Sequence, residues 1–552
     1  MAEKITREEL NRHPLARKNL KALADSGQSL AADWLNQAPA GGAAELIEGA
    51  GGLKILAVGG QAQASRYNPQ KEAGQWLEKF VPAGGLQSPL LYGLGSPWLA
   101  AGLLEKAGAV KFFEPDPLVI LASFSLHDFS PFLADGRMRL LTPWHLADDE
   151  EGWKNSTLLV HPPAQRREPA QLASLRRALG GQGRDLRGLS GRAPRIMIIP
   201  PLSGGSWPVA VALARAAETG GHPLFFLDWE PGLKALETEA HKAPPAESAR
   251  LVGRLFEQTG PKAAAAAADF KPDLIVALAQ APLDAPGLGR LRETGEAPLA
   301  FWLVEDFRHF DYVAQVAPSY DALFHIQPGL IEPALRNWGL PGARARYLPL
   351  AADPDIFQPL PPDFPNGFNA DLSFMGAGYP NRRRVLGALA AKYWPGTGRP
   401  AEAFRVFGSG WAGADPALRA HLFEGGRRVT LPECALIYAG GRVNLNIHSS
   451  FRSTPGFDPE SRFVNPRAFE IAAAGALQLV DPRPLLPELF EADRELVVAE
   501  SPEHLPELID HYLAHPEEAE AIGRAARTRV LAEHTYGHRL AKMLTDLGWA
   551  GQ

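Results

Sequence analysis

Short apolar runs alternate with amphipathic, alanine-rich segments along most of the chain. This alternation predicts buried parallel strands joined by helices. The expected strands fall into three groups, each followed by glycine turns or acidic residues: 53–60, 88–92 and 110–114; 195–199, 273–280, 298–306 and 321–327; 371–375, 403–407 and 443–450. Ligands of such sheets gather at the carboxyl ends of the strands. The pattern therefore predicts an α/β protein whose functional residues follow its strands.

Two polar stretches separate these groups. Residues 180–194 are rich in glycine and arginine, and residues 346–365 are rich in proline. Both compositions are typical of linkers. The expected units are a helical leader over 1–50, a Rossmann-like domain over 51–185 and two further α/β domains over 193–347 and 348–552, with a last helix that could cross back.

The stretch 463–481, FVNPRAFEIAAAGALQLVD, carries the strongest local signal. Asn465 is a favourable N-cap before Pro466 at the first helical position, and Gly475 is placed to end the helix. The free amides of such a helix start can hold an anion. Arg467 and Glu470 lie one turn apart, and two interpretations stay open: a surface ion pair, or a seat in which Arg467 holds phosphate and Glu470 binds ribose hydroxyls.

Bulk composition excludes several classes of protein. The 552 residues carry a formal net charge of −6 with a pI near 6.2, which argues against a general nucleic-acid binder. A single cysteine, Cys434, excludes an intramolecular disulfide and a cysteine-built zinc site. The charged first 20 residues lack the apolar core of a signal peptide, and no apolar run reaches the ~20 residues of a membrane span. A cytoplasmic location is expected.

From about residue 195 onward the sequence resembles glycosyltransferases of the GT-B fold, more closely the CgeB-type, group-1-like bacterial branch. The resemblance is carried by SGGSWPVAVALARAAETGGH, WLVEDFR, LPLAADPDIFQP, DLSFMGAGYPNRR, FGSGW, VNLNIHSS, VNPRAFEIAAAGALQLVD and LAEHTYGHR. It implies two facing Rossmann-like domains, an acceptor side over 193–347 and a nucleotide-sugar donor side over 348–552, preceded by an additional Rossmann-like domain. A nucleotide-diphosphate sugar is then the co-substrate, with no bound cofactor or metal.

The resemblance also implies roles for individual residues. Glu470 matches the ribose-binding glutamate, and the helix start with Asn465 and Arg467 matches the diphosphate site. The other matching positions are a glycine turn with a basic cluster on the donor side and a glycine loop on the acceptor side: Gly376, Gly378, Asn381, Arg382, Arg383, Gly204 and Gly205. His448 ends the expected strand 443–450 at the cleft, where it could touch the donor or be a polar loop residue.

Glycosyl transfer needs positive charge for the leaving diphosphate, and an inverting enzyme also needs a general base near the acceptor hydroxyl. Glu305 and Asp306, at the end of one acceptor-side strand, are the candidates for that base, although paired acids there often cap the next helix. Two positions depart from the family pattern. Arg462 stands where retaining relatives often carry a second glutamate, and Ala377 stands where many have an arginine.

Two other functions stay open. The glycine turn GLG at 93–95, followed by Glu114, outlines an S-adenosylmethionine-dependent methyltransferase, although Pro97 and Trp98 fit that motif poorly. A non-catalytic GT-B scaffold is the other alternative. The expected acceptor is a protein, a lipid-linked glycan or a surface glycan, including flagellar ones, and no nucleic acid or transmembrane partner is expected.

Overall fold

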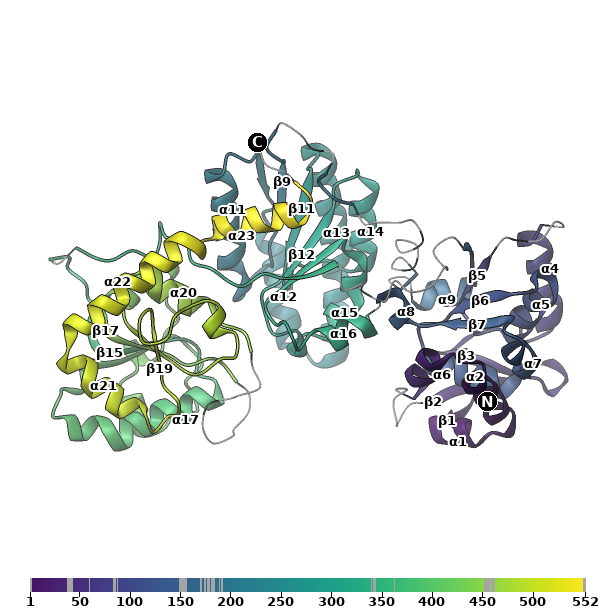
Figure 1. Cartoon of the computed structure of the whole chain (residues 1–552), viewed down its shortest axis with the longest axis horizontal. Helices are drawn as coiled ribbons and strands as arrows, with labels where there is room; N and C mark the ends of the chain where they lie inside the picture. The colour runs from purple at the N-terminus through teal and green to yellow at the C-terminus, as the bar shows by residue number, and fades with distance from the viewer. Residues whose placement is uncertain are drawn as a thin grey trace.

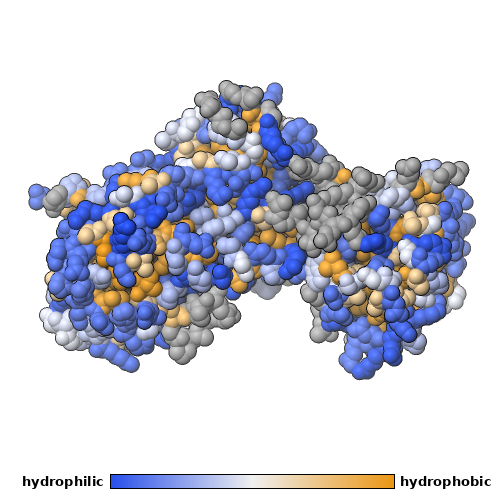
Figure 2. All heavy atoms as spheres, in the orientation of Figure 1, coloured by the Kyte–Doolittle hydropathy of each residue, from blue (hydrophilic) through white to orange (hydrophobic). Residues whose placement is uncertain are grey.

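The computed structural model contains four β-sheets (Figure 1). It describes residues 2–36, 43–58, 60–82, 86, 88–147, 156–168, 171–172, 175, 179, 184–187, 189, 192–338, 340, 344–361, 363–450, 457 and 462–549. Three sheets are parallel, as in Rossmann-like domains. The fourth is a small antiparallel sheet near the N-terminus. Hydrophilic residues predominate on the face that Figure 2 shows.

The N-terminal part combines a parallel sheet with the antiparallel one. The parallel sheet has the order β7-β6-β5-β8, with β5 (Pro89–Tyr92), β6 (Val110–Phe113), β7 (Met138–Leu141) and β8 (Thr157–Val160). The antiparallel sheet has the order β1-β2-β3-β4, with β1 (Ala2–Thr6), β2 (Ala43–Glu48), β3 (Lys54–Val58) and β4 (Gln61–Ala62). The helices are α1 (Arg7–Arg12), α2 (Pro14–Asp25), α3 (Ser29–Leu35), α4 (Pro69–Phe80), α5 (Pro97–Ala107), α6 (Pro117–Leu126), α7 (Ser130–Ala134), α8 (Pro143–Ala147) and α9 (Pro162–Arg167).

Two expectations for this region were wrong. Residues 1–50 are not a purely helical leader, because they contribute β1 and β2, and the apolar run at 53–60 pairs antiparallel with β2 instead of opening the parallel sheet. The leader is also part of the domain: Leu10 and Leu23 share one core with Phe124 of α6. The Asn19 side chain donates hydrogen bonds to the carbonyls of Phe124 and His127, at 2.9 and 2.7 Å. The buried apolar contacts and the hydrogen bonds of Asn19 together attach the leader to the domain.

The middle domain is built on a six-stranded parallel sheet of order β10-β9-β11-β12-β13-β14. Its strands are β9 (Ile196–Ile199), β10 (Leu224–Phe226), β11 (Leu274–Leu278), β12 (Leu299–Leu303), β13 (Ala322–His325) and β14 (Ala345–Tyr347), and its helices are α11 (Ser206–Thr219), α12 (Pro231–Lys242), α13 (Pro245–Phe270), α14 (Ala285–Glu293), α15 (Tyr312–Val316) and α16 (Glu332–Asn337). The four central strands are buried along their whole length, as their near-continuous apolar sequences predict.

The C-terminal domain has a five-stranded parallel sheet of order β16-β15-β17-β18-β19. Its strands are β15 (Ala370–Met375), β16 (Phe404–Phe407), β17 (Gly441–Asn446), β18 (Gln478–Val480) and β19 (Val497–Val498), and its helices include α17 (Pro380–Ala388), α18 (Pro416–Arg419), α19 (Leu431–Gly440), α20 (Pro466–Ala473), α21 (Leu505–Ala514) and α22 (Pro516–Glu533). Helix α23 (Tyr536–Asp546) leaves this domain and packs on α11 (Figure 1). Two doubly wound domains joined in this way confirm the expected α/β fold of the GT-B type.

Candidate active site

A cavity of about 190 Å³ lies between the middle and C-terminal domains. The middle domain contributes the start of α11, and the C-terminal domain contributes α19, α20 and the end of β15. The lining residues are Gly205, Pro208, Val209, Ala212, Asp353, Ile356, Phe357, Met375, Leu431, Cys434, Tyr438, Pro466, Arg467, Glu470 and Tyr536. The glycine loop and the residues of α20 that the sequence predicted therefore meet in one cavity.

The N-terminus of α20 is held in place by a chain of buried polar groups. Asn465 is the N-cap, and its side chain accepts a hydrogen bond from the Ala468 amide at 3.1 Å, as expected. The Asn465 amide donates to His448 Nε2 at 2.9 Å, while His448 Nδ1 lies 2.7 Å from Asp481 Oδ1. Arg483 pairs with the other carboxylate oxygen of Asp481. These bonds fix the direction in which the free amides of α20 point.

His448 therefore positions the helix instead of touching a donor. Its side chain is fully buried, and both ring nitrogens have protein partners. Burial lowers the pKa of His448 to about 4, so the imidazole is neutral at pH 7 and can accept the Asn465 bond. The spacing placed His448 at the correct end of β17. It could not show that Asp481, 33 positions later, contacts the Nδ1 atom of the ring.

Two arginines meet beside Gly376. A β-carbon added at Gly376 would lie 3.0 Å from Arg467 Nη2 and 3.2 Å from Arg382 Nη1. Both guanidinium groups lie over the ring of Phe374, at 5.3 Å for Arg467 and 5.5 Å for Arg382. The missing side chain at position 376 leaves a small space flanked by two cations. We call Gly376, Arg382 and Arg467 the arginine cradle.

The cradle contains positive charge without a counterion. Arg382 and Arg467 are 4% and 9% exposed, and within the described part of the chain neither forms an ion pair with a carboxylate. Their bonds go to neutral acceptors: Arg382 Nε to the Ile447 carbonyl at 2.8 Å, and Arg467 Nη1 to Asn446 Oδ1 at 3.1 Å. Burial, and then repulsion by Arg467, lower the pKa of Arg382. Buried cations usually have partners, so the cradle has the charge expected of an anion site.

The remaining donor-side candidates lie around the cradle in different roles. Gly378 allows close packing, because a β-carbon there would lie 2.5 Å from the Gly410 carbonyl oxygen. Asn381 holds the loop after β17, donating to the His448 carbonyl at 2.8 Å and accepting from the Ser450 amide at 3.0 Å. Arg383 lies against Gly413, in the loop after β16, and not beside the cradle. Of the expected basic cluster, the structure brings Arg382 alone together with Arg467.

Glu470 lies on the cavity wall one turn beyond Arg467. It forms no ion pair with Arg467; its Oε2 accepts a hydrogen bond from the Tyr438 hydroxyl at 3.3 Å. Burial raises the pKa of Glu470 to about 7 despite the opposing charge of Arg467. A carboxylate in this state gains from any further hydrogen-bond donor. Sequence reasoning missed Tyr438, which α19 carries to the same wall and which has no distinguishing local signal.

On the acceptor side, the glycine loop contacts Glu305. A β-carbon at Gly205 would lie 3.2 Å from Glu305 Oε1, and the Ser206 hydroxyl donates to the same oxygen at 3.3 Å. Burial raises the pKa of Glu305 to about 6. Gly204 has φ +94°, and a β-carbon there would approach Gln280 Oε1 at 3.3 Å. Gln280 itself holds a left-handed φ of +66°, a strained conformation that sequence reasoning did not identify.

Asp306 does not act with Glu305 as a catalytic pair. It caps the 3-10 helix Phe307–His309 by accepting from the Arg308 amide at 3.0 Å, and it forms an ion pair with the Arg308 guanidinium at 2.6 Å. These bonds lower the pKa of Asp306 against the effect of burial. The prediction that Asp306 belongs to the general base is therefore corrected: Asp306 has a structural role. Both of its carboxylate oxygens have protein partners, and the residue is 5% exposed.

The two departures from the family pattern lie in different places. Arg462 reaches across to the middle domain, where its Nε donates to the Pro328 carbonyl at 3.1 Å and its guanidinium lies against Gly329. It therefore links the two domains instead of lining the cavity. Ala377 is exposed beside the cradle, and its carbonyl accepts from Arg382 Nη1 at 3.1 Å.

The structure does not support the methyltransferase alternative. Glu114, the acidic residue on which that alternative depends, is fully buried and forms an ion pair with Arg167. Its Oε2 accepts from the Leu94 amide at 2.9 Å, and its Oε1 accepts from the Asp116 amide at 3.1 Å. Three protein donors hold the Glu114 carboxylate inside the domain, and it has no exposed surface at which a ribose hydroxyl could meet it.

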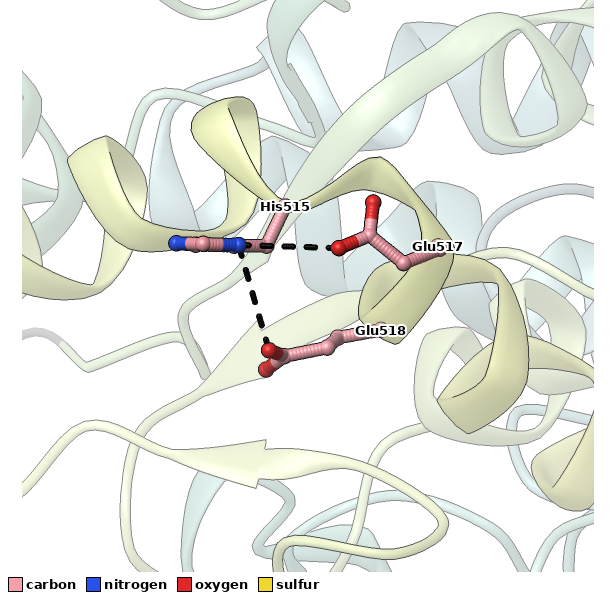
Figure 3. A group of neighbouring side chains, drawn as sticks. All are labelled: His515, Glu517 and Glu518. Carbon is pink, nitrogen blue, oxygen red and sulfur yellow. Dashed lines mark ion pairs between the residues drawn. The ribbon is translucent and has the colours of Figure 1, made fainter.

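Among the described residues, one group of side chains could offer three metal ligands: His515, Glu517 and Glu518 (Figure 3). All three are exposed at the start of α22, where each glutamate pairs with His515. This helix of 18 residues places them about 27 Å from Tyr536 and the cavity. They take no part in the site. Among the described helices, none has the length and hydropathy needed to cross a membrane.

Comparison with known proteins supports the assignment of the C-terminal domain. Residues 382–545 match the family model described as glycosyl transferase-like. A search of curated proteins finds no match. The match makes this segment a glycosyltransferase-like domain, and the expected enzyme class is confirmed at that level.

Solved structures that are similar in part include a sucrose-phosphate synthase, a glycosyltransferase and a protein in complex with UDP-glucose. Sucrose-phosphate synthase from Thermosynechococcus elongatus is 15% identical over 64% of this chain and 99% of that chain, with a TM-score of 0.42. A glycosyltransferase from Rickettsia africae is 15% identical over 65% and 98%, with a TM-score of 0.44. Anabaena HepE in complex with UDP-glucose is 13% identical over 63% and 98%, with a TM-score of 0.42.

Proposed function

We propose that the protein transfers a sugar from a nucleotide-diphosphate donor to an acceptor hydroxyl in the cavity between its middle and C-terminal domains. The single observation that carries this proposal is the arginine cradle, two buried guanidinium groups without a carboxylate partner at the start of α17 and α20. A diphosphate supplies the missing negative charge and accepts hydrogen bonds from both arginines and from the free amides of α20.

The remaining roles follow from the distances. Glu470 lies one helical turn beyond Arg467, so it accepts hydrogen bonds from the ribose that follows the diphosphate. The bond between the sugar and the diphosphate oxygen breaks, and the acceptor oxygen takes the sugar. Glu305, which is mostly ionised at pH 7 because its pKa is about 6, receives the acceptor's proton. The arginine cradle stabilises the charge on the departing diphosphate, and no metal is required in this proposal.

The finer assignments belong to the proposal as well. The CgeB-type bacterial branch is supported by the sequence stretches named above, and a cytoplasmic location by the single cysteine. The acceptor is proposed to be a protein, a lipid-linked glycan or a surface glycan. The scaffold alternative loses support because a decayed site has no use for two buried cations without a partner.

Calorimetric titration with UDP, GDP, CDP, dTDP and S-adenosylmethionine, each in the presence of EDTA, tests the proposal. One nucleoside diphosphate should bind, and Glu470→Ala should weaken it by the ~1–3 kcal/mol of lost charge-assisted hydrogen bonds, about 5- to 150-fold. Glu402→Ala replaces an exposed carboxylate just before the amino end of β16, whereas the site lies at the carboxyl ends of the strands; it is the matched control and should bind as the wild type does. Binding that requires Mg²⁺ would contradict metal independence, and the absence of any nucleotide binding would refute the donor site.

A further inference from the structure

The N-terminal domain contains a second cavity, of about 310 Å³, which the proposed reaction does not use. It lies where β5 and β8 end and α5 begins. In the order β7-β6-β5-β8, β6 and β7 are added on one side of β5, and β8 is then added on the other side of β5. This is the topological switch point at which open α/β sheets bind ligands. The lining residues are Ala62, Gln63, Ala64, Ser65, Glu72, Ala73, Trp76, Ser96, Leu99, His161, Pro162, Pro163 and Arg166.

Several hydrogen-bonding groups of this cavity have no partner among the residues that the structure describes. Trp76 Nε1 and His161 Nδ1 are buried and unbonded, and the His161 side chain is 6% exposed. Ser96 is the N-cap residue of α5, but its hydroxyl makes no capping bond. The first amides of that helix therefore keep their positive end toward the cavity. Buried polar groups are rarely left without a partner, so these atoms indicate a missing one.

The side-chain acceptors Gln63 and Glu72, in contrast, each already accept a hydrogen bond. Gln63 Oε1 accepts from Arg167 at 2.9 Å, and the Glu72 carboxylate accepts from the Ser65 amide at 2.6 Å. Arg166 adds an exposed guanidinium for which the described residues show no ion pair. Among the described lining residues, the groups without a partner are therefore mainly donors, while the charges of Arg166 and Glu72 balance each other. Its other walls, including Leu99 and the indole of Trp76, are apolar.

We propose that this cavity binds a small molecule through a phosphate or carboxylate group seated at the N-terminus of α5. The anion accepts hydrogen bonds from the first amides of α5, from the Ser96 hydroxyl and from the Trp76 indole, while Arg166 faces it from the rim. The neutral His161 ring donates to or accepts from the ligand according to its tautomer. The apolar part of the ligand lies against Trp76 and Leu99. This site is independent of the donor site between the other two domains.

Substitutions at Ser96 test the proposal without weakening the helix, because Ser, Asn and Asp are comparable N-caps. Ser96→Asp places a fixed negative charge where the anion would lie, and Ser96→Asn is the neutral matched control. Both are made in the full chain carrying Arg467→Met, so that the arginine cradle does not contribute anion binding. The probes are inorganic phosphate and acetate, measured by calorimetry and by the quenching of tryptophan fluorescence.

We expect at least one probe to bind the Arg467→Met protein. Its affinity should fall at least tenfold in Ser96→Asp and stay within about threefold in Ser96→Asn, with equal melting temperatures. The probe that binds more tightly distinguishes a phosphate from a carboxylate ligand. Equal affinity in the Asp and Asn variants, or no binding of either probe once Arg467 is replaced, would overturn the proposal. Neither result bears on nucleotide binding at the donor site, which is measured in the chain that keeps Arg467, so the two proposals fail separately.

Discussion

Replacing Arg467 with methionine should weaken nucleotide binding while leaving the empty protein as stable as before, or more stable. Methionine keeps the unbranched stem but removes a cation that is 9% exposed and has no carboxylate partner. The two acceptors of Arg467 do not become orphaned. Asn446 Oδ1 also accepts from Asn465 Nδ2 at 2.8 Å, and the Ile447 carbonyl also accepts from Arg382 Nε at 2.8 Å. The usual cost of breaking a buried polar pair is therefore absent.

The loss in binding follows from the bonds that the guanidinium would make. A charge-assisted bond to phosphate contributes about 1.5–3 kcal/mol, so Arg467→Met should raise the Kd of the nucleoside diphosphate by about 10- to 150-fold. Calorimetry gives the affinity, and thermal melting of the empty protein gives the sign of the stability change. Arg383→Met is the matched control, because Arg383 lies against Gly413, outside the cradle. A Kd within threefold of the wild type, or a clear fall in the melting temperature of the empty protein, would refute the reasoning.

Three further outcomes are expected. Since burial raises the pKa of Glu470 to about 7, its carboxylate destabilises the fold as the pH rises from 4.5 to 7; Glu470→Gln should gain melting temperature relative to the wild type at pH 8 and lose that gain at pH 5. Glu305→Gln should lower kcat by about 10²- to 10⁴-fold and remove the acid limb near pH 6 from the pH–rate profile, whereas Asp306→Asn should retain that limb. Glu114→Ala should cost about 3–5 kcal/mol in unfolding free energy by leaving Arg167 buried and unpaired, and Arg167→Met in the same chain should restore part of it, which a double-mutant cycle in denaturant measures. A cycle without coupling would contradict the ion pair's structural role.

The elements that hold the site could be predicted because their signals are local. Asn465, Pro466 and Gly475 mark the start and end of α20 within a few positions, and the structure has the helix between them, with Gly475 at φ +70°. The apolar run that follows is β18. Gly376 and Arg382, which follow β15 within a few positions, indicated an anion site from local sequence as well. Caps, turns and periodicity depend on neighbours in sequence, which a single chain displays.

The errors arose where the deciding contact is distant in sequence. Nothing near residue 53 shows that its strand pairs with 43–48 and 2–6 instead of joining a parallel sheet, because antiparallel pairing of β1 with β2 spans three helices. His448 looked available as a ligand contact because its partners, Asp481 and the Asn465 amide, arrive from later elements. Glu305 lies at the glycine loop, whereas Asp306 pairs with Arg308 and caps a helix. The sequence could not distinguish these two roles, because adjacent acidic residues have the same local signal.

The path of the chain between its last two domains makes the C-terminal domain an insertion. The chain enters it after β14 and leaves it before α23, and the two crossing segments lie side by side, with Ala352 bridged to Thr535. Arg539 fastens them from the α23 side by donating to the carbonyls of Pro349 and Leu350, at 2.8 Å each. Because both ends of the insertion are adjacent, the segment between them is a cassette that could be exchanged with that of another transferase by two cuts at these positions. The middle domain would keep its own strands and recover α23 as part of its wall. If the proposed donor and acceptor sides hold, a chimera built this way should change the nucleotide and leave the acceptor unchanged.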